Sequence, residues 1–113
     1  MTQPSNNTIT VEKNPPQSRL DTLDVTKWST WQKEASIFPW TFLEQEIAYI
    51  LEGECVITPT NGAPVTFGKG DLVTFPAGMS ASWEVKNALH KHYKLDGNIV
   101  SQTFKRIKAA LKL

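Results

Sequence analysis

Apolar and polar residues alternate along most of the chain in short runs that are separated by turn-forming residues. Alternation with period two, together with β-branched and aromatic composition, is typical of strands that bury one face. The breaks include Asn61-Gly62, a hairpin signal, and Gly68-Lys69-Gly70, which favours a sharp reversal. The runs are residues 8–12, 38–42, 46–52, 55–59, 65–67, 71–75, 80–85 and 89–95. The pattern predicts roughly eight or nine short antiparallel strands in an all-β barrel.

The run over residues 46–52 is largely apolar on both of its faces. Alternation directs Glu46, Ala48 and Ile50 to one side, and Ile47, Tyr49 and Leu51 to the other. One face can look into the barrel, and the other then needs a cover. Three covers are open: the N-terminal segment, a C-terminal helix or a second subunit. The third of these predicts a homodimer.

The two ends of the chain differ from its middle. Residues 17–35 lack a clean period, and we interpret them as an arm on which Trp28 and Trp31 are largely buried against the barrel. Residues 99–113 place apolar side chains at helical spacing between basic ones, which predicts a short C-terminal amphipathic α-helix packed on its own domain. The predicted organisation is one domain, with an N-terminal strand or tail over 1–13, the barrel over 14–98 and the helix over 99–113.

Composition excludes several classes of protein. Twelve Lys and Arg against eleven Asp and Glu leave a net charge of +1, which gives no footprint for nucleic acid. The sequence has neither a secretory signal nor an apolar run long enough to span a bilayer, so no membrane association is expected. Cys55 is the one cysteine, and its apolar surroundings predict a buried, inert thiol. A soluble protein in the reducing cytoplasm fits these features best.

Two spaced motifs carry a family resemblance. Glu46 is followed after six residues by Gly53, and Gly70-Asp71 is followed by Pro76 and Gly78, with sixteen residues between Gly53 and Gly70. This skeleton resembles the two motifs of the cupin superfamily. The surrounding string over residues 11–95 is similar to small single-domain cupins related to ethanolamine-utilisation cupins and ureidoglycine aminohydrolase. The resemblance implies a double-stranded β-helix, the cupin jelly roll, in which the final helix is an addition.

The resemblance also implies where a metal would be bound, and here the residues depart from the family. The two histidines of the first motif fall on Trp40 and Phe42, or on Pro39 and Thr41, and the third falls on Ala81. Glu46 is the one family ligand that remains. A single carboxylate among indole rings does not suit a transition metal. No metal and no cofactor are therefore expected.

A rebuilt metal site is the alternative to that conclusion. His90 and His92 share one face of the last strand, as paired ligands would, and Glu46 could complete their site. The flanking Lys91 and Lys94 disfavour a cation there. The competing interpretation is one surface histidine and one hydrogen-bonded histidine.

The carried-over positions define a candidate pocket for a small-molecule ligand. Its predicted residues are Trp40, Phe42, Glu46 and Ala81, with Trp83 added by strand alternation and His92 from the last strand. An acidic group in an aromatic cup could hold an ammonium or amidine group, or stack on a sugar face. The same aromatics could instead fill space that the metal has left.

Two functions of different classes follow. The first is a metal-free, non-enzymatic small-molecule-binding barrel. The second is a metal-independent enzyme, an isomerase, epimerase or hydrolase of a small sugar or nitrogen compound, with Glu46 as general acid or base. Tyr49 and His92 are the available partners for such chemistry, but Tyr49 is expected to face away from Glu46.

Overall fold

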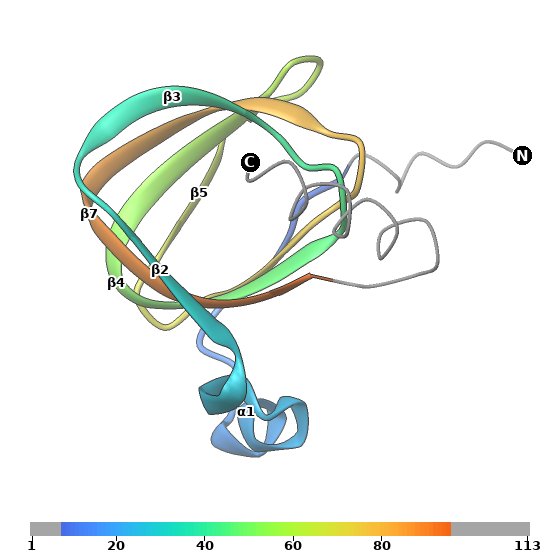
Figure 1. Cartoon of the computed structure of the whole chain (residues 1–113), viewed down its shortest axis with the longest axis vertical. Coiled ribbons are helices and arrows are strands. Elements are labelled where there is room, and N and C mark those ends of the chain that lie inside the picture. The colour runs from blue at the N-terminus through green and yellow to red at the C-terminus, as the bar shows by residue number, and fades with distance from the viewer. Residues whose placement is uncertain (1–7, 96–113) are drawn as a thin grey trace, which may run out of the picture.

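The computed structural model describes residues 8–95, which form an antiparallel β structure with one short α-helix and one 3-10 helix (Figure 1). The elements are β1 (Thr10–Glu12), α1 (Gln17–Leu23), η2 (Val25–Lys27), β2 (Ser29–Lys33), β3 (Ser36–Thr41), β4 (Glu46–Pro59), β5 (Val65–Gly68), β6 (Leu72–Phe75) and β7 (Ser80–Leu95). In this part of the chain no helix is long and apolar enough to cross a membrane. The C-terminal helix expected over 99–113 lies outside the described residues.

Two long strands, β4 and β7, run through both halves of the fold. In one half, residues 46–49 of β4 pair with β6 and residues 89–93 of β7 pair with β2. With β1 beside β6, the strand order of this half is β1-β6-β4-β7-β2. The other segments of β4 and β7 pair with β5 and β3, which gives the order β5-β4-β7-β3. The strands therefore curve around a common centre, with α1 outside them (Figure 1). This is the antiparallel, jelly-roll type of arrangement that the sequence predicted.

A bulge at Gly53 lets β4 bend without ending. Gly53 has a φ of +106°, and a Cβ atom there would lie 2.5 Å from the carbonyl oxygen of Ala88, so only glycine fits. The register with β7 shifts between Ile50 and Cys55. Across this bulge the buried positions of β4 change from even-numbered residues, ending at Ile50, to odd-numbered ones, beginning at Cys55.

The number of strands is smaller than the roughly eight or nine that the sequence predicted. Residues 46–52 and 55–59 were expected to be separate strands, and so were 80–85 and 89–95, but each pair forms one continuous strand. The hydrogen-bonded ladder continues through the irregular positions, and the chain does not reverse at Gly53. The described chain therefore has seven strands.

The core is an aromatic cluster between the two halves. Trp83 contacts three buried phenylalanines, with ring centroids 6.2 Å from Phe42, 5.9 Å from Phe67 and 5.6 Å from Phe75. Cys55 is completely buried in the same cluster. Burial raises the pKa of this thiol to about 12, against the effect of nearby Lys91, so the prediction of an inert thiol agrees with the structure.

The outer face of β4 is covered by the N-terminal segment. Leu20 of α1 and Val25 of η2 form a second buried cluster with Leu72, against which Ile47 and Tyr49 pack. Of the three covers that the sequence left open, the N-terminal arm is the one present within residues 8–95. The helix in this arm was not predicted, because it has only seven residues and buries only Leu20, too little to show a helical period.

The two arm tryptophans do not share one environment, and both are only partly buried. Trp28 packs on the second cluster, outside β4, whereas Trp31 lies in β2 and packs against the main core. The expectation of two largely buried side chains is wrong in this respect. Trp31 is only partly buried because it lies in β2 and its side chain faces a cavity, which is described below.

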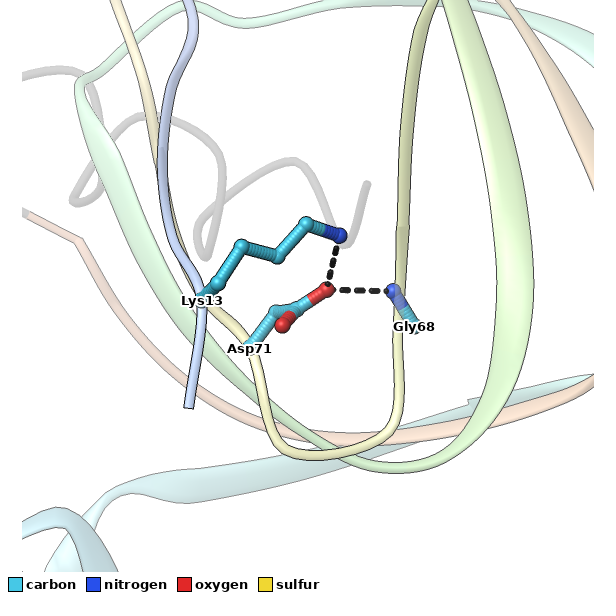
Figure 2. Close-up of polar contacts among 3 residues, drawn as sticks. All are labelled: Lys13, Gly68 and Asp71. Atoms are coloured by element: carbon cyan, nitrogen blue, oxygen red, sulfur yellow. Dashed lines mark hydrogen bonds and ion pairs between the residues drawn. The ribbon is translucent and has the colours of Figure 1, made fainter. Parts of the chain in front are cut away.

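Asp71 explains the Gly-Asp pair of the second sequence motif. Its Oδ2 atom accepts a hydrogen bond from the Gly68 backbone N–H at 2.9 Å and forms an ion pair with Lys13 Nζ at 2.9 Å (Figure 2). Gly70, in the same turn, has a φ of +90°, which favours glycine. The buried Asp71 carboxylate thus joins the turn before β6 to the segment that follows β1.

Candidate functional site

A cavity of about 230 Å³ lies where side chains of β2, β3, β4 and β7 meet. Five aromatic rings and one leucine surround a carboxylate and an ammonium group. The lining residues are Trp31, Phe38, Trp40, Glu46, Trp83, Lys91, Tyr93 and Leu95. Four of these side chains come from β7, which is distant in sequence from the other three strands, and the pairing of β7 with β2, β3 and β4 brings them together.

Glu46 and Lys91 form a buried ion pair in this cavity. Lys91 Nζ lies 2.5 Å from Glu46 Oε2, and the two side chains are 6% and 9% exposed for Lys91 and Glu46 respectively. In the register of β4 and β7, Lys91 is opposite Ile50, so its side chain reaches along the strand to Glu46. Burial of either charge alone would be costly, and the direct hydrogen bond between them makes the burial of both tolerable.

The ammonium group of Lys91 is also enclosed by aromatic rings. Its Nζ atom is 5.1 Å from the ring centroids of Trp31 and Trp83, 5.7 Å from Tyr93 and 5.8 Å from Phe75. Distances within about 6 Å of a ring are typical of cation–π attraction. The sequence suggested that aromatic rings around Glu46 could hold an ammonium or amidine group of a ligand, but the ammonium group that lies among these rings is that of Lys91.

The structure brings three of the predicted pocket residues together. Trp40, Glu46 and Trp83 line the cavity, and Trp40 is 48% exposed at its edge. Phe42 and Ala81 are buried in the main core and do not line it. Phe42 stacks on Phe75 with the ring centroids 4.7 Å apart, and its ring centroid is 6.2 Å from that of Trp83, which does line the cavity.

His92 is not brought into the pocket, which corrects its predicted place. It lines a separate hollow beside α1, together with Tyr49, and its Nδ1 atom lies 3.3 Å from the carbonyl oxygen of Trp28. Neighbouring residues of a strand point to opposite faces, and Lys91 points inward. His90 and His92 therefore lie on the face away from Glu46, and residues 8–95 contain no group of three or more His, Cys, Asp or Glu that could hold a metal.

Sequence reasoning missed Lys91, Tyr93, Trp31 and Phe38 as lining residues. One signal was available: Lys91 and Tyr93 have the same odd-numbered parity as Ala81 and Trp83, which would place them on one face of an unbroken strand. That signal was lost because 80–85 and 89–95 were treated as separate strands. Trp31 and Phe38 are placed by pairing with β7, which local pattern does not reveal.

The fold defines a class of protein, the small antiparallel jelly roll, here with one aromatic-lined cavity described above. Comparison with family models is more specific. The model of the EutQ-like cupin domain matches residues 20–93, and the chain therefore belongs to this cupin family. No curated protein sequence matches the chain.

Solved structures agree with this assignment. A DUF861 family protein from Thermotoga maritima is 40% identical over 79% of this chain and all of its own chain, with a TM-score of 0.77. A putative ethanolamine utilization protein Q from Salmonella typhimurium is 27% identical over 58% of this chain, with a TM-score of 0.54. The EutQ protein of Clostridium difficile, at 24% identity over 58% of this chain and a TM-score of 0.53, shows the fold alone. The aligned regions cover 53% and 52% of the two EutQ chains respectively.

Proposed function

We propose that this cupin binds a small organic molecule in the cavity around Glu46 and Lys91, without a metal. The observation that supports this is an aromatic-walled cavity that also contains a buried charge pair. Binding sites for small molecules are concave and mostly apolar, with a few polar groups that fix the orientation of the ligand. A volume of about 230 Å³ is below the roughly 300–1,000 Å³ of sites for drug-sized ligands, so the ligand is small.

The metal-free part of the proposal rests on the surroundings of Glu46. The donor set does not fit a transition metal, because Lys91 Nζ lies 2.5 Å from the carboxylate and its charge repels a cation. Among the residues that the structure describes, no imidazole or thiolate lines the cavity. Elemental analysis of purified protein should find far less than one equivalent of any transition metal. A content near one equivalent that is lost in Glu46→Ala would overturn this part.

Binding is tested by blocking the cavity. A library of small flat molecules is screened by ligand-observed NMR against wild type, Leu95→Trp and Lys94→Trp. Leu95 lines the cavity, and Trp at this position should fill it and abolish binding. Lys94 is exposed on the opposite face of β7, so Lys94→Trp is the matched control and should bind like wild type. The absence of binders, or binding that survives in Leu95→Trp, would overturn the proposal.

A metal-independent isomerase, epimerase or hydrolase that uses Glu46 is the second function that the sequence suggested. Tyr49 and His92, its suggested partners, lie outside the cavity. The titratable groups that line the cavity are Glu46, Lys91 and Tyr93. The Glu46 carboxylate already accepts a hydrogen bond from Lys91 Nζ, so it is not directed freely at a substrate. This contact favours binding over catalysis.

We also propose a homodimer, and the support for it comes from β3 instead of from β4. The outer face of β4 is covered by the arm, so it no longer calls for a second subunit. Within residues 8–95 the large exposed apolar side chains are Ile37 at 72%, Leu43 at 58% and Trp40, all in β3 or the turn after it. Among the described residues β3 pairs only with β7, so its other edge is open to a second chain. Light scattering should give a dimer for wild type at high micromolar concentration and a monomer for Ile37→Glu; a monomeric wild type would refute the dimer.

A cytoplasmic location is also retained as a proposal. It is supported by the sequence having only one cysteine, Cys55, whose thiol is free and buried. Cell fractionation tests it, and recovery of the native protein outside the cytoplasm would contradict it.

A further inference from the structure

We infer that the ligand of the cavity is a small, flat, uncharged molecule that presents an amide-type pair, a carbonyl oxygen beside an N–H group. The inference rests on the proposed binding function and adds the chemical class of the ligand. It is drawn from the Glu46–Lys91 pair and from the rings that enclose it.

The pair offers a hydrogen-bond donor and an acceptor side by side. An ammonium group has three N–H donors, and a carboxylate has two oxygens with about four acceptor positions. Lys91 uses one donor on Glu46 Oε2, so the pair has capacity for further hydrogen bonds of both kinds. A carbonyl oxygen facing Lys91 and an N–H group facing Glu46 would match this arrangement. An amide carries both groups on one edge.

The charge of the site disfavours ligands that carry a net charge. Lys91 and Glu46 together are neutral, and because they are only 2.5 Å apart, a charged ligand group near one is also near the other. Attraction and repulsion then largely cancel, while the cost of removing the ligand charge from water remains. A cationic ligand has a further disadvantage, since Lys91 already occupies the aromatic cup.

The walls favour a flat molecule. Phe38 and Trp83 are stacked, with centroids 5.9 Å apart and an interplanar angle of 12°, and Trp31 meets Phe38 edge-on at 6.5 Å. Aromatic faces attract other planar groups by offset stacking or edge contacts. An amide conjugated to a ring combines this shape with the donor and acceptor that the ion pair requires.

Three isosteric probes test the class: benzamide, benzoate and benzamidinium. All three are a phenyl ring bearing a flat three-atom group, and they differ in charge and in donors and acceptors. Dissociation constants are measured by NMR titration on the full chain. Benzamide should bind about tenfold more tightly than either charged probe, which corresponds to the loss of about one hydrogen bond. Equal or tighter binding of benzoate or benzamidinium would overturn the inference.

Charge variants provide a second readout that a purely structural role would not change. In Lys91→Met the remaining carboxylate should shift the preference to benzamidinium, and in Glu46→Gln the remaining ammonium should shift it to benzoate. Lys94→Met, an exposed position on the same strand, should keep the order of wild type. An unchanged order in both cavity variants would refute the inference. If Lys91→Met does not fold, as circular dichroism would show, Glu46→Gln and wild type decide alone.

The two proposals fail in different ways. If other molecules bind in the cavity and are lost in Leu95→Trp, but none of the three probes displaces them, the amide class is wrong and the binding function stands. If nothing binds to the wild-type cavity, the binding function itself is wrong.

Discussion

Replacement of Lys91 by Met should strongly destabilise the barrel, because it leaves a carboxylate buried without its partner. Met keeps an unbranched side chain that is one atom shorter, so the ammonium group is lost and a sulfur replaces one methylene. Glu46, whose side chain is 9% exposed, then loses the hydrogen bond and the opposite charge at 2.5 Å. Breaking a buried pair from one side costs about 3–5 kcal/mol. In a domain of this size each kcal/mol lowers the melting midpoint by about 4 °C.

The reverse replacement should cost less. Glu46→Met leaves the ammonium of Lys91 between Trp31 and Trp83, each 5.1 Å away, and a cation can remain stabilised by ring faces where a carboxylate cannot. We expect a loss of about 2–3 kcal/mol, in the range for a hydrogen bond to a charged group. In the double variant two apolar side chains replace the pair. Its stability should lie within about 1 kcal/mol of wild type, or above it.

Guanidinium chloride unfolding at pH 7, followed by far-UV circular dichroism, measures this cycle. The dependence of the unfolding free energy on denaturant must be unchanged for the values to be compared. Lys94→Met removes an exposed lysine from the same strand and should change stability by no more than about 0.5 kcal/mol. If the double variant lost the sum of the two single losses, or Lys91→Met lost no more than Lys94→Met, the pair would not be energetically coupled and the reasoning would be wrong.

Three further predictions follow from the core and the turn. Cys55 should resist alkylation at pH 8 until the protein is unfolded. The free energy of unfolding should fall as pH rises above 9, because the unfolded thiol then ionises while the folded one, with a pKa of about 12, keeps its proton. The slope of the unfolding free energy against pH is compared with that of Cys55→Ala, and identical slopes would contradict the prediction. Asp71→Ala should cost about 1–3 kcal/mol in chemical denaturation, since it leaves the Gly68 N–H without its acceptor, whereas an unchanged midpoint would show that the turn does not need the carboxylate. Trp83→Ala should lower the free energy of unfolding by about 3–5 kcal/mol, because this side chain is only 2% exposed. Trp40→Ala should lower it by less than about 1.5 kcal/mol, because Trp40 is 48% exposed. Equal losses in the two variants would contradict this difference in packing.

Local pattern was sufficient to predict most of the strand-forming segments and the two faces of the first part of β4, but not β2 or the continuity of β4 and β7. Glu46 and Ile50 are buried toward the barrel, and Ile47 and Tyr49 face the other way, as alternation requires. Burial of Cys55 could be predicted for the same reason, since an apolar residue in an apolar strand is normally in the core. These features depend only on neighbours in sequence.

The composition of the cavity depended on contacts that local pattern does not contain. The bulge at Gly53 changes which residues of β4 are buried, and the continuity of β7 directs Lys91 inward and His92 outward. Trp31 reaches the cavity because β2 pairs with β7 opposite Lys91. The sequence by itself therefore determined the class of fold and the acidic member of the site. Only the tertiary structure decided that the partner of Glu46 is a lysine of this chain, because strand register and bulges are set by packing between distant segments.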